Sequence, residues 1–267
     1  MGKPDDEGRD RRGMFEDTNR IRFAVDVDDD DREWWLASIY DPYALTPEDV
    51  AERLSSSWTG EKSIVVTELS GATRRFGATV SGSFGAGKFW ILHRTLDFRG
   101  TFLNADRMFI DEARQGEGIG RRFMADAVAL AMTLGLDRVT LEADNIGRYA
   151  WLRCGFLPDR GAWMRMRPDI ITRIAGAADE LPLDRFMQIL EIARNENPMA
   201  ARELAALTDS VTSTTLFDAH AHPRAVPLGR ALFLEASPPW AGSLDLNDSV
   251  SMDVLDRYLR SSGEPFG

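Results

Sequence analysis

The 267-residue sequence has little cysteine, little positive charge and no long apolar run. Its single cysteine, Cys154, excludes an internal disulfide framework. Lysine and arginine number 32 against 43 acidic residues, a net charge of −11. This balance argues against non-specific nucleic-acid binding and suits an amine or a basic peptide as partner. No apolar run approaches the roughly 20 residues that span a bilayer, and the N-terminus lacks a signal-peptide core. We therefore expect a cytoplasmic protein without a membrane partner.

Three glycines lie close together in the segment between residues 110 and 121. Gly116, Gly118 and Gly120 lie between an apolar, strand-like run and an amphipathic helix. Glycine permits positive φ and close backbone approach, and the first amides of a helix have no internal acceptor. With the helix macrodipole, such a loop is typical of an anion-binding site, and a phosphate or pyrophosphate is the expected anion. The residues expected to face inward on the helix are Phe123, Met124, Ala127, Leu130, Ala131 and Leu134.

Two motifs in this region resemble those of the GCN5-related N-acetyltransferases (GNAT). Gln115, Gly118 and Gly120 meet the Arg/Gln-x-x-Gly-x-Gly/Ala signature, and the preceding strand ends at the matching offset, with Glu112 in place of the usual proline. Residues 138–143 then alternate like a strand, and a short helical stretch from Asn145 ends at Gly-Phe, residues 155–156, like the family's second motif. The strand and the signature of the first motif follow the family's spacing without an insertion or a deletion.

The resemblance implies a mixed α/β fold, with a mainly antiparallel twisted sheet whose central strands splay apart, flanked by helices. It implies acetyl-CoA as co-substrate, without a metal. Main-chain groups of Phe109 and Ile110 would bind the pantetheine arm and polarise the thioester carbonyl. Asn145 would bind the pantetheine or cap its helix. The residues whose amides would hold the pyrophosphate are Gln115, Gly116, Glu117, Gly118, Ile119, Gly120 and Arg121.

The implied activity is transfer of an acetyl group to a primary amine of a small molecule or basic peptide, by direct attack. This chemistry needs a general base, and the candidates are Asp106 and Glu142. On an uninterrupted strand, Asp106 shares a face with Met108 and Ile110. Glu142 lies near the carboxyl end of its strand, where sheets commonly bind ligands. The sequence leaves the acceptor open, and a homodimer is possible.

The general acid is the point at which the sequence departs from the family. Trp151 occupies the position of the family's tyrosine, and an indole N–H cannot practically give up its proton. Tyr149 lies two residues earlier, about 200 degrees away around the helix. Water and Cys154 stay open as proton donors. A catalytically silent acyl-CoA sensor or a structural protein is therefore the alternative function.

The pattern predicts three segments: a disordered charged tail (1–19), a GNAT-like domain (20–167) and a mainly helical C-terminal module of unknown role (168–267). Asp28–Asp31 is expected to be a solvated turn or helix N-cap. Strands are expected over 21–25, 63–69, 76–83, 88–96, 101–110, 138–143 and 225–236. Helices are expected from Thr46 to about residue 54 or 58, after Gly120, from Asn145, and over 168–178, 182–195, 198–207 and 249–259.

Two further patterns resemble motifs of other enzymes. Residues 82–89 nearly spell a nucleotide-binding phosphate loop, but Phe89 stands where Mg²⁺ needs a hydroxyl, so a hairpin turn is the better interpretation. His220 and His222 resemble the start of a metal-dependent amidohydrolase. Only 45 residues follow His222 and no barrel can be built from them, so we expect a polar loop.

Overall fold

The computed structural model describes residues 11, 13–213 and 224–260. Contacts within the chain divide it into two compact units, Met1–Thr140 with Ser262–Gly267, and Leu141–Ser261. The division falls earlier than the predicted domain boundary at residue 167, within the strand that covers residues 138–143. That boundary stays a prediction. The histidine pair at 220 and 222, and most of the predicted disordered tail, lie outside the described residues.

The first unit is built on a mixed, mainly antiparallel sheet, as predicted. Its strands are β1 (Ile21–Phe23), β2 (Lys62–Ser70), β3 (Arg75–Gly85), β4 (Lys88–Asp97), β5 (Phe102–Ile110) and β6 (Arg138–Ala143). They lie side by side in chain order. The pairings from β2 to β5 are antiparallel, whereas β1–β2 and β5–β6 are parallel. Strand β6 starts in this unit and ends in the second.

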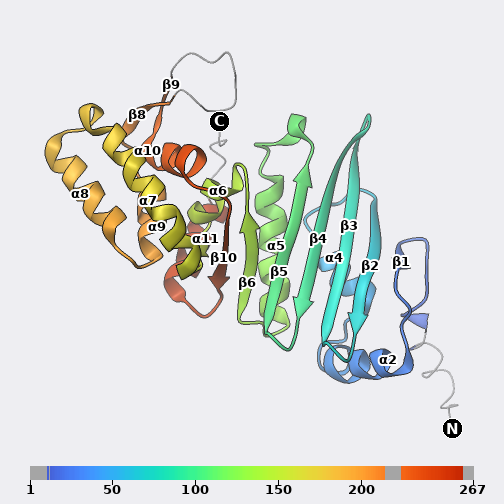
Figure 1. Ribbon diagram of the computed structural model, residues 1–267. Coiled ribbons are helices and arrows are strands. Elements are labelled where there is room, and N and C mark those ends of the chain that lie inside the picture. Colours follow the sequence, from blue (N-terminus) through green and yellow to red (C-terminus); the bar gives the residue numbers. More distant parts are fainter. Residues whose placement is uncertain (1–10, 12, 214–223, 261–267) are drawn as a thin grey trace, which may run out of the picture. The chain divides into compact units, whose positions relative to one another are not determined.

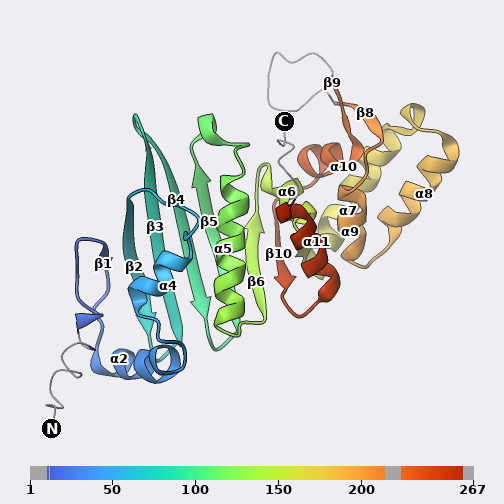
Figure 2. The same ribbon diagram turned by 180° about the vertical axis from the view of Figure 1, so that it is seen from behind.

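Helices cover one face of this sheet, and the alternation of buried side chains explains which one. Trp90, Leu92 and Leu96 on β4 are fully buried on that face. Helices α4 (Pro47–Arg53) and α5 (Ile119–Thr133) lie against it (Figure 2). All six α5 residues predicted to face inward are buried. Figure 1 shows the opposite face, which we call the open face because no helix of the first unit lies on it in the described residues.

Local signals in the sequence set the ends of these elements. Asp28 caps α2 (Asp29–Trp35) by accepting a hydrogen bond from the amide of Asp31, so the N-cap interpretation of the aspartate run is confirmed. Thr46 and Asp49 form a capping box at α4. Between β3 and β4 the chain turns at residues 85–87 with positive φ, so the phosphate-loop-like segment is a hairpin.

The second unit is mainly helical, with short strands. Its elements after β6 are α6 (Gly147–Arg153), β7 (Leu157–Pro158), α7 (Arg160–Gly176), η3 (Ala178–Glu180), α8 (Leu183–Arg194), α9 (Met199–Ala205), β8 (Ser210–Ser213), β9 (Arg224–Pro227), α10 (Leu228–Ala231), η4 (Leu232–Ala236), β10 (Trp240–Asp245) and α11 (Ser249–Arg260). Strand β10 pairs with β7, and β8 with β9, both antiparallel.

Two predictions for this unit are wrong, and both involve a proline. The strand expected over 225–236 ends at Pro227, and the chain continues as helix. Pro168 does not start a helix but lies inside α7. It is on the exposed side of α7, where solvent can satisfy the carbonyl that lacks its amide partner.

Replacing Pro168 by alanine is expected to stabilise the protein. The new amide can bond the carbonyl of Met164, and alanine is preferred over proline inside a helix by about 3 kcal/mol. The unfolded chain gains entropy worth about 1 kcal/mol, which opposes this. We expect a higher midpoint of urea unfolding, whereas Asp169→Ala, on the same exposed side, should change it little. A lower midpoint for Pro168→Ala would show that α7 requires the proline.

Candidate active site

The glycine-rich loop leads directly into α5, as the sequence predicts. Gly116 and Gly118 have positive φ, 86° and 73°, and Gly118 is the N-cap of α5. No side chain caps this helix end, so the first amides of α5 have no side-chain acceptor. The loop is held from behind, because the Gln115 side-chain amide donates to the Ile110 carbonyl at 3.1 Å. A helix of 15 residues thus presents an uncapped N-terminus behind two glycines.

Gly120 sets the distance between α5 and β5. A Cβ atom at this position would lie 2.9 Å from Met108 Cε and 3.4 Å from Ile110 Cδ1. Glycine lets the first turn of α5 pack on the end of β5 without displacing the Met108 side chain. At Gly118 a Cβ would approach the flexible guanidinium of Arg121 at 3.0 Å, on a backbone that disfavours any side chain. Both glycines therefore occupy places that a side chain would fill.

An ion pair lies across the same loop. Arg114 Nη2 is 2.5 Å from Glu117 Oε2, and the Arg114 guanidinium lies 4.7 Å from the centre of the Phe84 ring. The hydrogen bond from Arg114 lowers the pKa of Glu117 below its usual range. Both side chains are at the surface, so the Glu117 carboxylate is ionised at neutral pH and keeps Arg114 beside the loop.

Strand β5 contains an irregularity that the sequence does not reveal. His93 pairs with Arg107, but the next pair is Thr95 with Asn104. Between these pairs β4 contributes one residue, Arg94, and β5 contributes two, Ala105 and Asp106. This is a β-bulge, and it reverses the face to which the following residues point.

The bulge changes the predicted placement of Asp106. Met108 and Ile110 point to α5, where they contact Gly120. Asp106 instead bonds Thr95 and Asn104 on the open face. The prediction that Asp106 shares a face with Met108 and Ile110 is therefore wrong. One extra residue in the strand moves Asp106 to the opposite side of the sheet.

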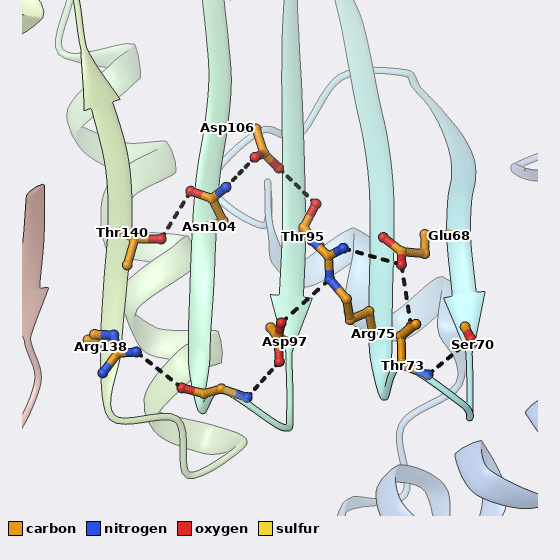
Figure 3. Close-up of polar contacts among 11 residues, drawn as sticks. Glu68, Ser70, Thr73, Arg75, Thr95, Asp97, Asn104, Asp106, Arg138 and Thr140 are labelled. Atoms are coloured by element: carbon orange, nitrogen blue, oxygen red, sulfur yellow. Dashed lines mark hydrogen bonds and ion pairs between the residues drawn. The ribbon is translucent and has the colours of Figure 1, made fainter. Parts of the chain in front are cut away.

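Figure 3 shows the polar side chains that hold Asp106 on the open face. One carboxylate oxygen accepts from the Thr95 hydroxyl at 2.8 Å, and the other accepts from the Asn104 amide. Asn104 in turn accepts from the Thr140 hydroxyl at 3.0 Å, so the chain of hydrogen bonds crosses three strands. A carboxylate fixed through both oxygens stays oriented. Nearer the β2–β3 and β4–β5 turns on this face, Arg75 makes ion pairs with Glu68 and Asp97.

Arg94 lies opposite the bulge and is 1% exposed. Its Nη1 donates to the carbonyls of His93 and Arg107, both at 2.9 Å, whereas Nε and Nη2 are buried without a partner among the described residues. Ala78 pairs with it on β3, and this small neighbour leaves room for the long side chain. Burial lowers the pKa of Arg94 to about 10, and the charge of Asp106 opposes this shift. Arg94 is therefore still charged at pH 7 and ties β4 to the bulge.

His93 is the functional candidate that the sequence reasoning missed. It lies on the open face beside the bulge, and its Nδ1 is 2.8 Å from the Thr79 hydroxyl. Burial lowers the pKa of His93, and the positive charge of Arg107 lowers it further. Its ring is therefore neutral at pH 7. The alternation of buried Trp90, Leu92 and Leu96 could have placed His93 on the solvent side, but only the bulge brings it next to Asp106.

The second motif lies in the second unit. Asn145 has a φ of 47° and is exposed, and its side-chain nitrogen lies 3.3 Å from Asp144 Oδ2. The N-cap of α6 is Ile146, so the alternative that Asn145 caps this helix is wrong. Glu142 is exposed on β6, without a hydrogen-bond or ion-pair partner in the described part of the chain. Its catalytic role stays a prediction.

Helix α6 ends as predicted, at Gly155 with a φ of 96°, and Phe156 is fully buried. Trp151 packs on Gly147, where a Cβ would lie 2.8 Å from the indole nitrogen. Tyr149 and Cys154 are buried, with exposed fractions of 7% and 1%, whereas Trp151 is partly exposed. Burial removes Cys154 from solvent, which leaves water as the open choice for the general acid.

The pairing between β5 and β6 is short. It runs from Phe102–Arg138 to Asn104–Thr140, which is three pairs. From Ala105 to Ile110, β5 pairs only with β4 among the described residues. The other edge of this stretch has no strand partner in the described residues, and on it the Ile110 carbonyl accepts from the Gln115 side-chain amide.

Comparison with known proteins agrees with this geometry. Residues 84–156 match the model of the acetyltransferase (GNAT) family. This segment is similar to the GNAT acetyltransferase domain. It contains the bulge, the glycine-rich loop, α5 and the second motif, so every predicted site residue lies within it.

No curated protein matches the chain. Among solved structures, the chain is similar to the crystal structure of nourseothricin acetyltransferase, with 18% identity and a TM-score of 0.28. That match covers 34% of this chain and 55% of the other, so the chain spans little more than half of that protein. A likeness of this extent adds nothing to the assignment of the GNAT segment.

Replacing Arg94 by methionine is expected to loosen the bulge without unfolding the protein. Methionine keeps most of the side-chain length and removes a buried charge that has two unpaired donors, so the free energy of unfolding should be unchanged or higher. Amide hydrogen exchange at residues 105–108 should become at least tenfold faster. Arg75→Met, which removes an arginine of the same sheet that is 37% exposed, is the control and should leave exchange at 105–108 unchanged. Unchanged exchange in Arg94→Met would contradict the conclusion that Arg94 ties β4 to the bulge.

Proposed function

We propose that this protein is an acetyl-CoA-dependent N-acetyltransferase that acts on a primary amine of a small molecule or basic peptide. The observation that supports this most is the uncapped N-terminus of α5 behind Gly116 and Gly118, inside a segment that matches the GNAT model. The loop fits the diphosphate of the co-substrate, because its glycines keep Cβ atoms out of the cradle and its amides lack side-chain acceptors. No cluster of metal-ligating side chains occurs among the described residues.

Each part of the GNAT segment has a role in this proposal. Amides from Gln115 to Arg121 would hold the pyrophosphate. Main-chain groups of Phe109 and Ile110, on the edge of β5 that β6 leaves unpaired, would hold the pantetheine arm and donate to the thioester carbonyl. Asn145, exposed after β6, is the proposed side-chain contact of the pantetheine.

Bound acetyl-CoA would supply an activated acetyl group: a bond forms between the acceptor nitrogen and the acetyl carbon, and the C–S bond breaks with its electron pair going to sulfur. The chain must bind the ammonium form of the acceptor and take up its proton. Asp106 and Glu142 are the carboxylates proposed for this work. Asp106 is the one that hydrogen bonds orient, through Thr95 and Asn104. The proton that ends on sulfur would come from water, because Trp151 cannot supply one.

A second candidate function is acyl-CoA binding without catalysis. Trp151 favours it, because it replaces the family's proton donor while its indole remains packed on Gly147. The two functions differ in one measurable respect. Both require affinity for coenzyme A, but only the first releases free thiol when an amine is added.

We expect the protein to release free thiol from acetyl-CoA in the presence of at least one class in a panel of polyamines, amino acids, aminoglycosides and basic peptides. Gly118→Ala should weaken coenzyme A binding at least tenfold in calorimetry, because a side chain at a φ of 73° strains the loop. Gly176→Ala is the matched control, since a Cβ there meets nothing within 4 Å. Binding without thiol release would support the silent protein. Absence of binding by the wild-type protein would refute both functions.

A further inference from the structure

Three side chains lie on the open face at the bulge, and they differ in charge and in the contacts that hold them. Asp106 is an oriented carboxylate whose two oxygens already accept hydrogen bonds. Arg107 is exposed and pairs across the ladder with His93. His93 is partly buried, and it alone of the three presents a neutral nitrogen base at pH 7.

The neighbours of His93 from each adjoining strand keep the ring neutral. On β3 the neighbour is the uncharged Thr79, which contacts Nδ1. On β4 it is the charged Arg94, and on β5 the charges are Arg107 and Asp106. Burial and the two arginines lower the pKa of the ring, and Asp106 raises it. Without Asp106 beside it, the ring would be harder still to protonate.

The contact with Thr79 holds the ring in place but does not set its tautomer, because a hydroxyl can donate or accept. In the tautomer with its proton on Nδ1, the ring donates to the Thr79 oxygen, and Nε2 carries the free lone pair. Nε2 has no hydrogen-bond partner in the described part of the chain. A neutral imidazole that is held through one nitrogen and free at the other is the arrangement of a general base.

We propose that His93 accepts the proton of the acceptor amine, and that Asp106 attracts and orients the ammonium. This assignment rests on the proposed function and refines it, because the role of base moves from Asp106 to His93 and Asp106 keeps the role of binding the ammonium. The acceptor enters as an ammonium and leaves as an amide, so it sheds two protons. One goes to His93 Nε2 and from there to solvent, and the other balances the proton that the departing sulfur takes from water.

The division of roles predicts opposite kinetic changes. His93→Gln removes the base but keeps a polar group, so kcat should fall about 100-fold, the lower end of what a general base contributes, with the KM for the amine little changed. Asp106→Asn keeps the shape but loses the charge, so the KM for the amine should rise at least tenfold with kcat within threefold. Arg75→Met, outside the site on the same face, is the control and should change neither.

The protonation of His93 can be measured without catalysis. In an NMR titration, the ring resonance that is missing from His93→Gln should titrate below pH 6.5. Arg107→Gln should raise its pKa by removing a positive neighbour, and the acid limb of the kcat profile should move to higher pH by the same amount. Thr79→Val, which removes the hydrogen-bond partner of Nδ1, should lower kcat at least fivefold.

Two results would overturn the assignment. The first is a wild-type enzyme that releases thiol while His93→Gln keeps kcat within threefold. The second is a His93 ring that titrates at or above pH 6.5 in the wild-type protein. Failure of the proposed function has a different signature, because the wild-type protein would then release no thiol with any amine, and the role of His93 would fall with it.

Discussion

The β-bulge in β5 is the constraint on which the rest of the site depends. By inserting one residue opposite Arg94, it lets Met108 and Ile110 pack on Gly120 while Asp106 faces the open side of the sheet. A regular ladder could not meet both requirements, because side chains alternate strictly along a strand. The bulge therefore joins the glycine-rich loop on one side to a set of titratable side chains on the other.

Buried charge is the cost of this arrangement. Arg94 leaves two donors unpaired in a fully enclosed position, and burial disfavours its charged form. The folded pKa of about 10 lies below the usual value of an arginine, so the folded state holds this proton less tightly than the unfolded chain does. The penalty is present at neutral pH and is relieved only as the pH rises above about 10. The same positive charge helps to keep His93 neutral. Arg94 thus destabilises the core and at the same time supports the chemistry proposed for the open face.

The sequence predicted those parts of the structure that depend on local patterns. The helix that starts behind Gly118, the inward row of α5, the strand at 138–143 and the Gly155 cap all follow from periodicity and backbone chemistry. The bulge could not be predicted, because it depends on how β5 pairs with β4, and the placement of Asp106 was wrong for that reason. The role of His93 was missed because it needs three strands side by side. Beyond residue 168, α8, α9 and α11 lie within two residues of the predicted helix ranges, whereas the strand expected over 225–236 ends at Pro227.

The central claim is that the loop before α5 and the free edge of β5 together bind the thioester donor. The most direct measurement is amide chemical-shift mapping by NMR during titration with coenzyme A. The account predicts saturable shifts concentrated at residues 109–110 and 115–121, with little change in β1 or β2. Saturable binding whose shifts lie elsewhere and leave the amides of Gly116, Gly118 and Gly120 unmoved would contradict it.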